Sequence, residues 1–182
     1  PNSSFPLGLD LGRGPRLVNI RTKVHLYVWQ GCSQSLIDAG WEPKGILCYK
    51  FFDEKKTWEE AQKSCRKQVK GQRLKLYMTA NTYKDTVLAT VLDQEDNNFV
   101  TSLAKGARFW IGGKRSCDGC QDWKWTQIFS KNAQNWAAGE PNNYGGNEDC
   151  VEVGNPLSED NMWNDQKCGE KIGYVCQTYL FI

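Results

Sequence analysis

A short polar stretch, GEPNNYGGNEDC at residues 139–150, contains the residue types that could bind a metal ion. It sets Glu140, Asn142 and Glu148 among glycines and a proline, and it lacks the apolar periodicity that would fix one shape. Such a composition is typical of a solvated turn, because Asn, Gly and Pro all favour turns. The alternative is that a ligand outside the chain gathers the side-chain oxygens.

A second polar stretch, NMWNDQKC at residues 161–168, offers further oxygens from Asn164 and Asp165. Each stretch ends on a cysteine, Cys150 in the first and Cys168 in the second. A disulfide between these two cysteines would hold the stretches together. The combination therefore favours one ligand site over two separate turns.

The oxygens on these two stretches match the preference of calcium. Three carboxylates and two amide carbonyls come from Glu140, Asn142, Glu148, Asn164 and Asp165. With the main-chain carbonyl of Asp165 they make about six oxygens, the low end of the roughly 6 to 8 that Ca²⁺ takes. A set of hard oxygen ligands excludes zinc and copper, and magnesium requires a tighter octahedron. We therefore predict a Ca²⁺ site.

The coordination positions left on such an ion predict a sugar ligand. About two positions stay open on an eight-coordinate calcium, and a vicinal diol can fill both. Each hydroxyl could also donate a hydrogen bond to Glu140 or Glu148 and accept one from the amide of Asn142 or Asn164. The pairing of acids with amides supplies both the acceptors and the donors that a sugar hydroxyl needs.

The composition bounds the classes of function. The chain has 182 residues, enough for one domain with an appendage. Lys and Arg number 23 against 21 Asp and Glu, so there is no basic field for phosphate backbones, and nucleic acid is not an expected partner. No apolar run approaches the length of about 18 residues that indicates a membrane span, so we expect no membrane insertion by this chain.

The cysteine content indicates an oxidising compartment. Eight cysteines, an even number, lie at positions 32, 48, 65, 117, 120, 150, 168 and 176. Such usage is typical of a disulfide framework in a secreted or extracellular protein, either free or as the ectodomain of a larger membrane protein. Zinc is the alternative, but it needs clustered pairs. Only Cys117 and Cys120 are so spaced, and the single histidine, His25, is remote.

The N-terminal part differs from the rest. Residues 1–16 are rich in Pro, Gly and Ser and read as an arm, whereas residues 17–29 alternate like a strand with one buried face. We expect this strand to dock on the main domain or on a second copy of the chain, because its apolar face would otherwise be wet. Residues 1–31 are therefore an arm and strand to which no role is assigned, and residues 32–182 form the main domain.

Two helices and a strand-rich remainder are expected. A capping box of Thr57 and Glu60, helical spacing from Trp58 to Val69, and Gly71 as C-terminal cap predict the first helix. The second is predicted from about Thr82 to Leu92, with four inward residues: Val87, Leu88, Val91 and Leu92. From ARFWIGG onward, short apolar runs and long polar connections indicate strands and loops. Helices followed by strands predict the α+β class.

The order and spacing of these motifs resemble the long form of the C-type lectin domain, from about Cys32 to Gln177. The landmarks are GWEPKGILCYKFF, TWEEAQKSC, FWIGG, WKW, NWAAGEPNN, EDCVEV, MWND and GYVC. The resemblance implies two helices against two small antiparallel sheets, with a long calcium-binding loop between Trp110 and Cys150. It also implies four disulfides, the last by elimination: Cys32–Cys48, Cys65–Cys176, Cys150–Cys168 and Cys117–Cys120.

The resemblance also assigns the site residues one by one. The sugar-binding calcium of the family would be held by Glu140, Asn142, Glu148, Asn164 and Asp165. In the family, Glu-Pro-Asn goes with mannose-type sugars (mannose, N-acetylglucosamine, fucose) and Gln-Pro-Asp with galactose. Pro141 is expected to follow a cis peptide bond. Tyr144 lies where family members often place a side chain against the sugar ring.

The chain departs from the family pattern at a second calcium site. That site draws on acidic residues shortly after the WIG strand, where this chain has Lys114 and Arg115. Asp149 and Asn143 match only part of it. A second calcium ion is therefore not predicted.

Two functions fit this reading, and a third does not. The first is calcium-dependent binding of glycans that end in mannose-type sugars, on glycoproteins or cell surfaces. The rival is a protein-recognition domain in which calcium is only structural. An enzyme is not expected, because no nucleophile and base can be assembled and Glu140 and Glu148 are taken up by the metal. A shallow site binds one sugar weakly, which favours a homo-oligomer.

Overall fold

The computed structural model describes residues 32–69, 86–117, 119–127, 134–154 and 161–179. The predicted arm and strand at residues 1–31 and the predicted helix cap at Gly71 lie outside these ranges. The elements in chain order are α1 (Gln34–Asp38), β1 (Glu42–Lys44), β2 (Leu47–Lys56), α2 (Trp58–Gln68), β3 (Val87–Leu88), α3 (Gln94–Ala104), β4 (Phe109–Arg115), β5 (Trp123–Trp125), the 3₁₀ turn η1 (Tyr144–Gly146), β6 (Cys150–Val153), β7 (Trp163–Gln166) and β8 (Ile172–Tyr179).

The central strand is β8. It pairs antiparallel with β2 and β3, and parallel with β4 through Phe109 opposite Gly173. On its opposite edge β4 pairs antiparallel with β6, which pairs antiparallel with β7, and β5 pairs antiparallel with Gly113–Arg115 of β4 on the same edge as β8. The two expected antiparallel sets are thus joined by the short parallel contact into one sheet, which has eight strands within the described ranges. The α+β class is confirmed.

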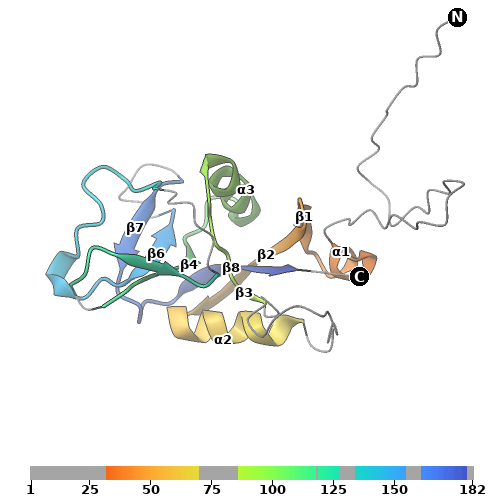
Figure 1. The fold of residues 1–182 in the computed structure, drawn as a ribbon. Coiled ribbons are helices and arrows are strands. Elements are labelled where there is room, and N and C mark those ends of the chain that lie inside the picture. Colours follow the sequence, from red (N-terminus) through yellow and green to blue (C-terminus); the bar gives the residue numbers. More distant parts are fainter. Residues whose placement is uncertain (1–31, 70–85, 118, 128–133, 155–160, 180–182) are drawn as a thin grey trace, which may run out of the picture.

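The helices α2 and α3 lie on opposite sides of this sheet (Figure 1). Side chains of β8 alternate between the two sides, as the two-residue period of a strand requires. Tyr174 and Cys176 belong to the buried cluster that contains Trp58, Ala61 and Cys65 of α2. The next cluster contains Val175 of β8 with Val100 and Ala104 of α3. None of the helices within the described ranges could span a membrane.

The first predicted helix is confirmed as α2, including its capping box. The Thr57 hydroxyl accepts a hydrogen bond from the Glu60 amide at 3.3 Å, and the Glu60 carboxylate accepts one from the Thr57 amide at 3.0 Å. This accepted hydrogen bond is the largest cause that lowers the pKa of Glu60. Both interactions satisfy amides that have no partner inside the helix.

Replacing Thr57 with Ala should lower the free energy of unfolding by about 1 kcal/mol, because one amide of the first turn loses its acceptor. Thr57→Ser keeps the hydroxyl and is the matched control. Urea unfolding of the two variants measures the difference. Equal stability of Thr57→Ala and the wild type would show that the cap does not stabilise α2.

The second predicted helix is wrong in position. Within the described part of residues 82–92, Val87 and Leu88 form β3, which pairs with β8, and α3 begins later, at Gln94. Three of the four inward residues were predicted correctly, since Val87, Leu88 and Val91 are buried, whereas Leu92 is only half-buried. They are buried in extended backbone, because a short apolar run fits a buried strand as well as a helix. The true start signal is Asp93, whose side chain accepts from the Asp96 amide at 2.9 Å.

The cysteines of the described residues are joined in the four pairs that the resemblance implies: Cys32–Cys48, Cys65–Cys176, Cys117–Cys120 and Cys150–Cys168. The second pair ties α2 to β8, and the last ties the start of β6 to the chain just after β7. With both of its cysteines in a disulfide, the Cys117 and Cys120 pair has no thiolate for zinc. The disulfide reading of that pair therefore holds in the structure.

Candidate functional site

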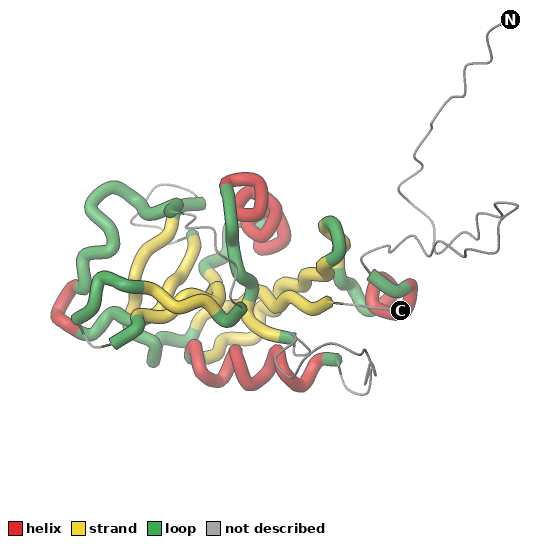
Figure 2. Tube along the Cα trace, viewed as in Figure 1, coloured by secondary structure: helices red, strands yellow, loops and turns green. Residues whose placement is uncertain are grey.

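Main-chain contacts and a disulfide bring the two polar stretches together. The chain before Glu140 runs beside β7: the Ala137 amide donates to the Trp163 carbonyl at 2.9 Å, and the Trp163 amide donates to the Asn135 carbonyl at 2.7 Å. On the other side, β6 pairs with β7 and the Cys150–Cys168 disulfide closes the end. The connection between these contacts forms the turn around η1, at the end of the molecule opposite α1 (Figures 1 and 2).

Asp165 is the centre of the site. Its carboxylate accepts from the main-chain amides of Asn142 at 3.0 Å and Asn143 at 2.9 Å. The Glu140 carboxylate accepts from the same Asn142 amide at 3.0 Å and from the Asn142 side chain at 2.8 Å. The Glu140–Pro141 peptide bond is cis, as expected. These contacts hold Glu140 and Asn142 of the first stretch against Asp165 of the second.

Glu148 belongs to the same cluster. Its carboxylate accepts from the Tyr144 amide at 2.9 Å, and its own amide donates to the Asn143 side-chain oxygen at 2.9 Å. Asn143 adopts the left-handed conformation, with φ of 49°, which lets the chain turn back at this point. Tyr144 itself is 75% exposed.

Two glutamates of the site have a raised pKa. Partial burial, and next the contact with Asp165, raise the pKa of Glu140 to about 7. Burial also raises the pKa of Glu148, with the Asp165 charge adding to the effect and the Tyr144 amide opposing it. The Asp165 charge therefore makes both glutamates harder to ionise. A hard divalent cation fits this donor set, because it would neutralise these charges.

The fifth predicted ligand, Asn164, is held by a different network. Its side-chain nitrogen donates to Glu152 at 2.9 Å, and the Glu152 carboxylate accepts from Arg108 at 3.0 Å and 2.5 Å. Glu152 has no exposed surface. Asn164 thus joins the cluster through its chain neighbour Asp165, while its amide nitrogen is fixed by Glu152.

Two charged residues next to the site were not predicted to have a role. Arg115 forms an ion pair with Asp165, and Glu152 orients Asn164. Each carried a signal in the sequence. Arg115 follows Ile111 at the even spacing that places both on one face of β4, and Glu152 is a lone charge between two valines of β6.

The comparison with protein families decides the identity of the fold. A family model described as the lectin C-type domain matches residues 54–178. The chain belongs to the C-type lectin family. C-type lectin domains are non-enzymatic binding domains, so this lectin is not an enzyme.

Individual relatives agree with this assignment. The C-type lectin PAL of Bitis arietans is 34% identical over 140 residues, which covers 75% of this lectin and 93% of that protein. The carbohydrate-recognition domain of cow CD23, solved in the presence of a GlcNAc2Man3 oligosaccharide, superposes with a TM-score of 0.62 at 25% identity and covers 83% of this lectin and 98% of that chain. The herring type II antifreeze protein reaches the same TM-score at 24% identity, covering 78% and 97%, which shows the fold alone.

Proposed function

We propose that this lectin binds mannose-type sugars through a calcium ion held by Glu140, Asn142, Glu148, Asn164 and Asp165. The observation that carries the proposal is the convergence of three carboxylates from two distant stretches on one hydrogen-bonded turn. Within the described residues these acids lack a cation that could neutralise all of them, and this favours an ion from solution. The oligosaccharide present with the cow CD23 domain supports a sugar as the ligand.

Each group at the site has a distinct part in sugar binding. The calcium ion, when bound, supplies a Lewis acid to which two neighbouring sugar hydroxyls can add their lone pairs. Glu140 and Glu148 accept the hydrogen atoms of those hydroxyls, and Asn142 donates to their oxygens. Tyr144, at the rim of the turn, offers an exposed ring against which the apolar face of the sugar can pack.

The order Glu140, Pro141, Asn142 is the basis for proposing mannose-type specificity. The positions of the acids and amides determine which sugar hydroxyls can meet an acceptor and a donor. A sugar whose 3- and 4-hydroxyls are both equatorial fits these positions in one orientation. Galactose, in which the 4-hydroxyl is axial, presents a different pair. Specificity for a glycan ending in mannose or N-acetylglucosamine follows from this geometry, and fucose, whose 4-hydroxyl is axial, would bind through its equatorial 2- and 3-hydroxyls instead.

Free mannose should release this lectin from a mannan column in calcium buffer, and galactose at the same concentration should not. Elution is measured with each sugar in turn, with EDTA as the reference for complete release. Galactose as the better eluent would contradict the assigned specificity. Retention that survives EDTA would contradict the calcium-bridged mechanism and favour the rival, protein recognition on this fold.

The proposal extends to the whole chain. Residues 32–182 would form the carbohydrate-recognition domain, and residues 1–31 a separate arm. Four disulfides suit a secreted or extracellular location, where glycans on glycoproteins and cell surfaces are available. An open site binds a single sugar weakly, so assembly of several copies would be needed for tight attachment.

A further inference from the structure

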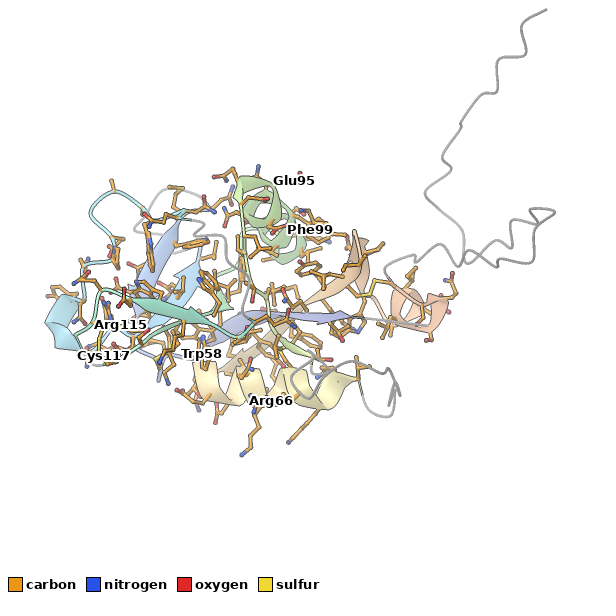
Figure 3. All side chains as sticks on the ribbon, viewed as in Figure 1. Trp58, Arg66, Glu95, Phe99, Arg115 and Cys117 are labelled. Atoms are coloured by element: carbon orange, nitrogen blue, oxygen red, sulfur yellow. A yellow bond between two sulfur atoms is a disulfide. The ribbon has the colours of Figure 1, made fainter. Side chains whose placement is uncertain are left out.

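The Arg115 side chain is buried beside the proposed calcium site. It extends from the last residue of β4, and its side chain is only 1% exposed. Figure 3 shows it close to Cys117, at the end of the molecule that carries the turn. Burying a charged group costs several kcal/mol unless partners compensate for the lost water. The partners of Arg115 therefore indicate what its charge does.

Four oxygens surround the guanidinium. Nη2 donates to Asp165 at 2.5 Å and to the Glu148 carbonyl at 2.9 Å, and Nη1 donates to the Cys120 carbonyl at 2.6 Å. Asp149 Oδ1 lies 3.0 Å from Nε but is not aligned for a hydrogen bond, and it is buried without another partner. One face of the guanidinium stacks on the Trp123 ring, 4.6 Å from its centroid. A cage of carboxylate and carbonyl oxygens is the environment that a metal cation also prefers.

These contacts anchor both ends of the turn. Asp165 accepts the amides of Asn142 and Asn143, and the Glu148 carbonyl belongs to the residue whose carboxylate accepts the Tyr144 amide. Among the described residues, Arg115 is the cation that pairs with Asp165 and Asp149. It compensates Asp165 in the absence of any metal.

We propose that the Arg115 guanidinium is a built-in cation that holds the 142–149 turn in its binding shape before calcium is bound. It takes the place of a second metal ion, so the turn takes up one calcium ion and not two. The claim that the turn takes up one calcium ion rests on the proposed function. The claim that Arg115 holds the turn concerns the metal-free protein and does not depend on calcium. Arg115 acts through Asp165 and Glu148, and it is a positioning residue.

The test is amide hydrogen exchange in EDTA, followed by NMR. Arg115→Met should speed exchange at the Asn142, Asn143 and Tyr144 amides by about 10-fold or more, because the acceptors of these amides lose their anchor. Arg115→Lys should give an intermediate effect, since an ammonium keeps the charge without the planar fork. The matched control is Lys114→Met, which removes a cation one residue away that pairs with exposed Glu59.

The effect of added calcium on hydrogen exchange distinguishes the proposed role of Arg115 from a general structural role. Added calcium should restore protection at the three turn amides of Arg115→Met, because the ion takes over the neutralisation of Asp165. Exchange at the core amide of Ala89, which donates to Val175, should stay at the wild-type rate throughout. Wild-type protection of the turn in Arg115→Met without metal would overturn the proposal, as would equal loss of protection in the core.

If the Arg115 variants do not fold, calorimetry of the wild-type chain still tests the proposal, because it counts the calcium ions that bind. One ion bound at this turn is expected, and two ions would overturn the proposal. If no calcium binds, the proposed function fails. The exchange rates of the Arg115 variants in EDTA still decide whether the guanidinium holds the turn.

Discussion

Replacing Asp165 with Asn should abolish calcium binding and with it the binding of sugar. Asp165 is fully buried, pairs with Arg115 and accepts the amides of Asn142 and Asn143. The variant removes a proposed ligand charge and also leaves the buried guanidinium without its carboxylate. Breaking such a pair costs about 3 kcal/mol or more. The loss of the ligand charge and the loss of the arginine's partner both weaken calcium binding, so this is the largest effect expected of a single substitution at the site.

Calorimetry with calcium and urea unfolding in EDTA measure the two losses separately. Asp96→Asn is the control: Asp96 pairs with Lys44 at 2.5 Å far from the turn, so this variant should lose stability but keep its calcium affinity. Glu140→Gln gives the complementary result, since it removes a proposed ligand charge without touching the Arg115 pair. Calcium binding by Asp165→Asn at the wild-type affinity would refute the assigned ligand set.

Acidification from pH 7.5 to 5 should release the sugar by weakening calcium binding about 50- to 100-fold. The metal-free site holds the pKa of Glu140 at about 7, raised first by burial and then by Asp165. A protonated carboxyl is a poor ligand, so below pH 7 the ion must displace a proton in order to bind. Each further pH unit then lowers the apparent affinity about tenfold.

The stability of the metal-free protein should change in the opposite direction. A carboxyl whose pKa is raised by folding binds more protons in the folded state, between its ordinary value and about 7. Stability in EDTA should therefore rise as the pH falls through this window, while calcium affinity falls. Two measurements at pH 7.5 and 5 test these opposite trends. Calcium is titrated against sugar binding, and the melting temperature is measured in EDTA. Identical calcium curves at the two pH values would contradict the mechanism, and Glu140→Gln should flatten both trends.

Local signals predicted the parts of this lectin that local chemistry determines. The capping box of α2 depends on residues three apart, and the structure contains it as the sequence suggests. The site residues were proposed from the combination of two polar stretches that each end on a cysteine, because either stretch alone would be typical of a turn. The structure gathers four of the five into one hydrogen-bonded cluster and holds Asn164 through Glu152.

The errors and omissions concern residues whose state depends on distant partners. Val87 and Leu88 are as apolar as the buried face of a helix, and only the pairing with Gln177 and Cys176 makes them a strand. Arg115 stood out in the sequence only as a departure from the acids expected at a second calcium site. Its proposed positioning role depends on the fold, which places Asp165, fifty residues later in the chain, against its guanidinium.

The five proposed ligands all lie outside the two apolar clusters that support the sheet. Mutations that alter the ligand can therefore accumulate in the turn without weakening the core, and mutations that repack the core need not touch the ligand. Natural selection can act on recognition and on folding almost independently. Asp165 is where the two pressures meet, because it serves the turn, the buried arginine and the proposed ion together. It should be the last of the five to drift when a descendant of this lectin changes its ligand.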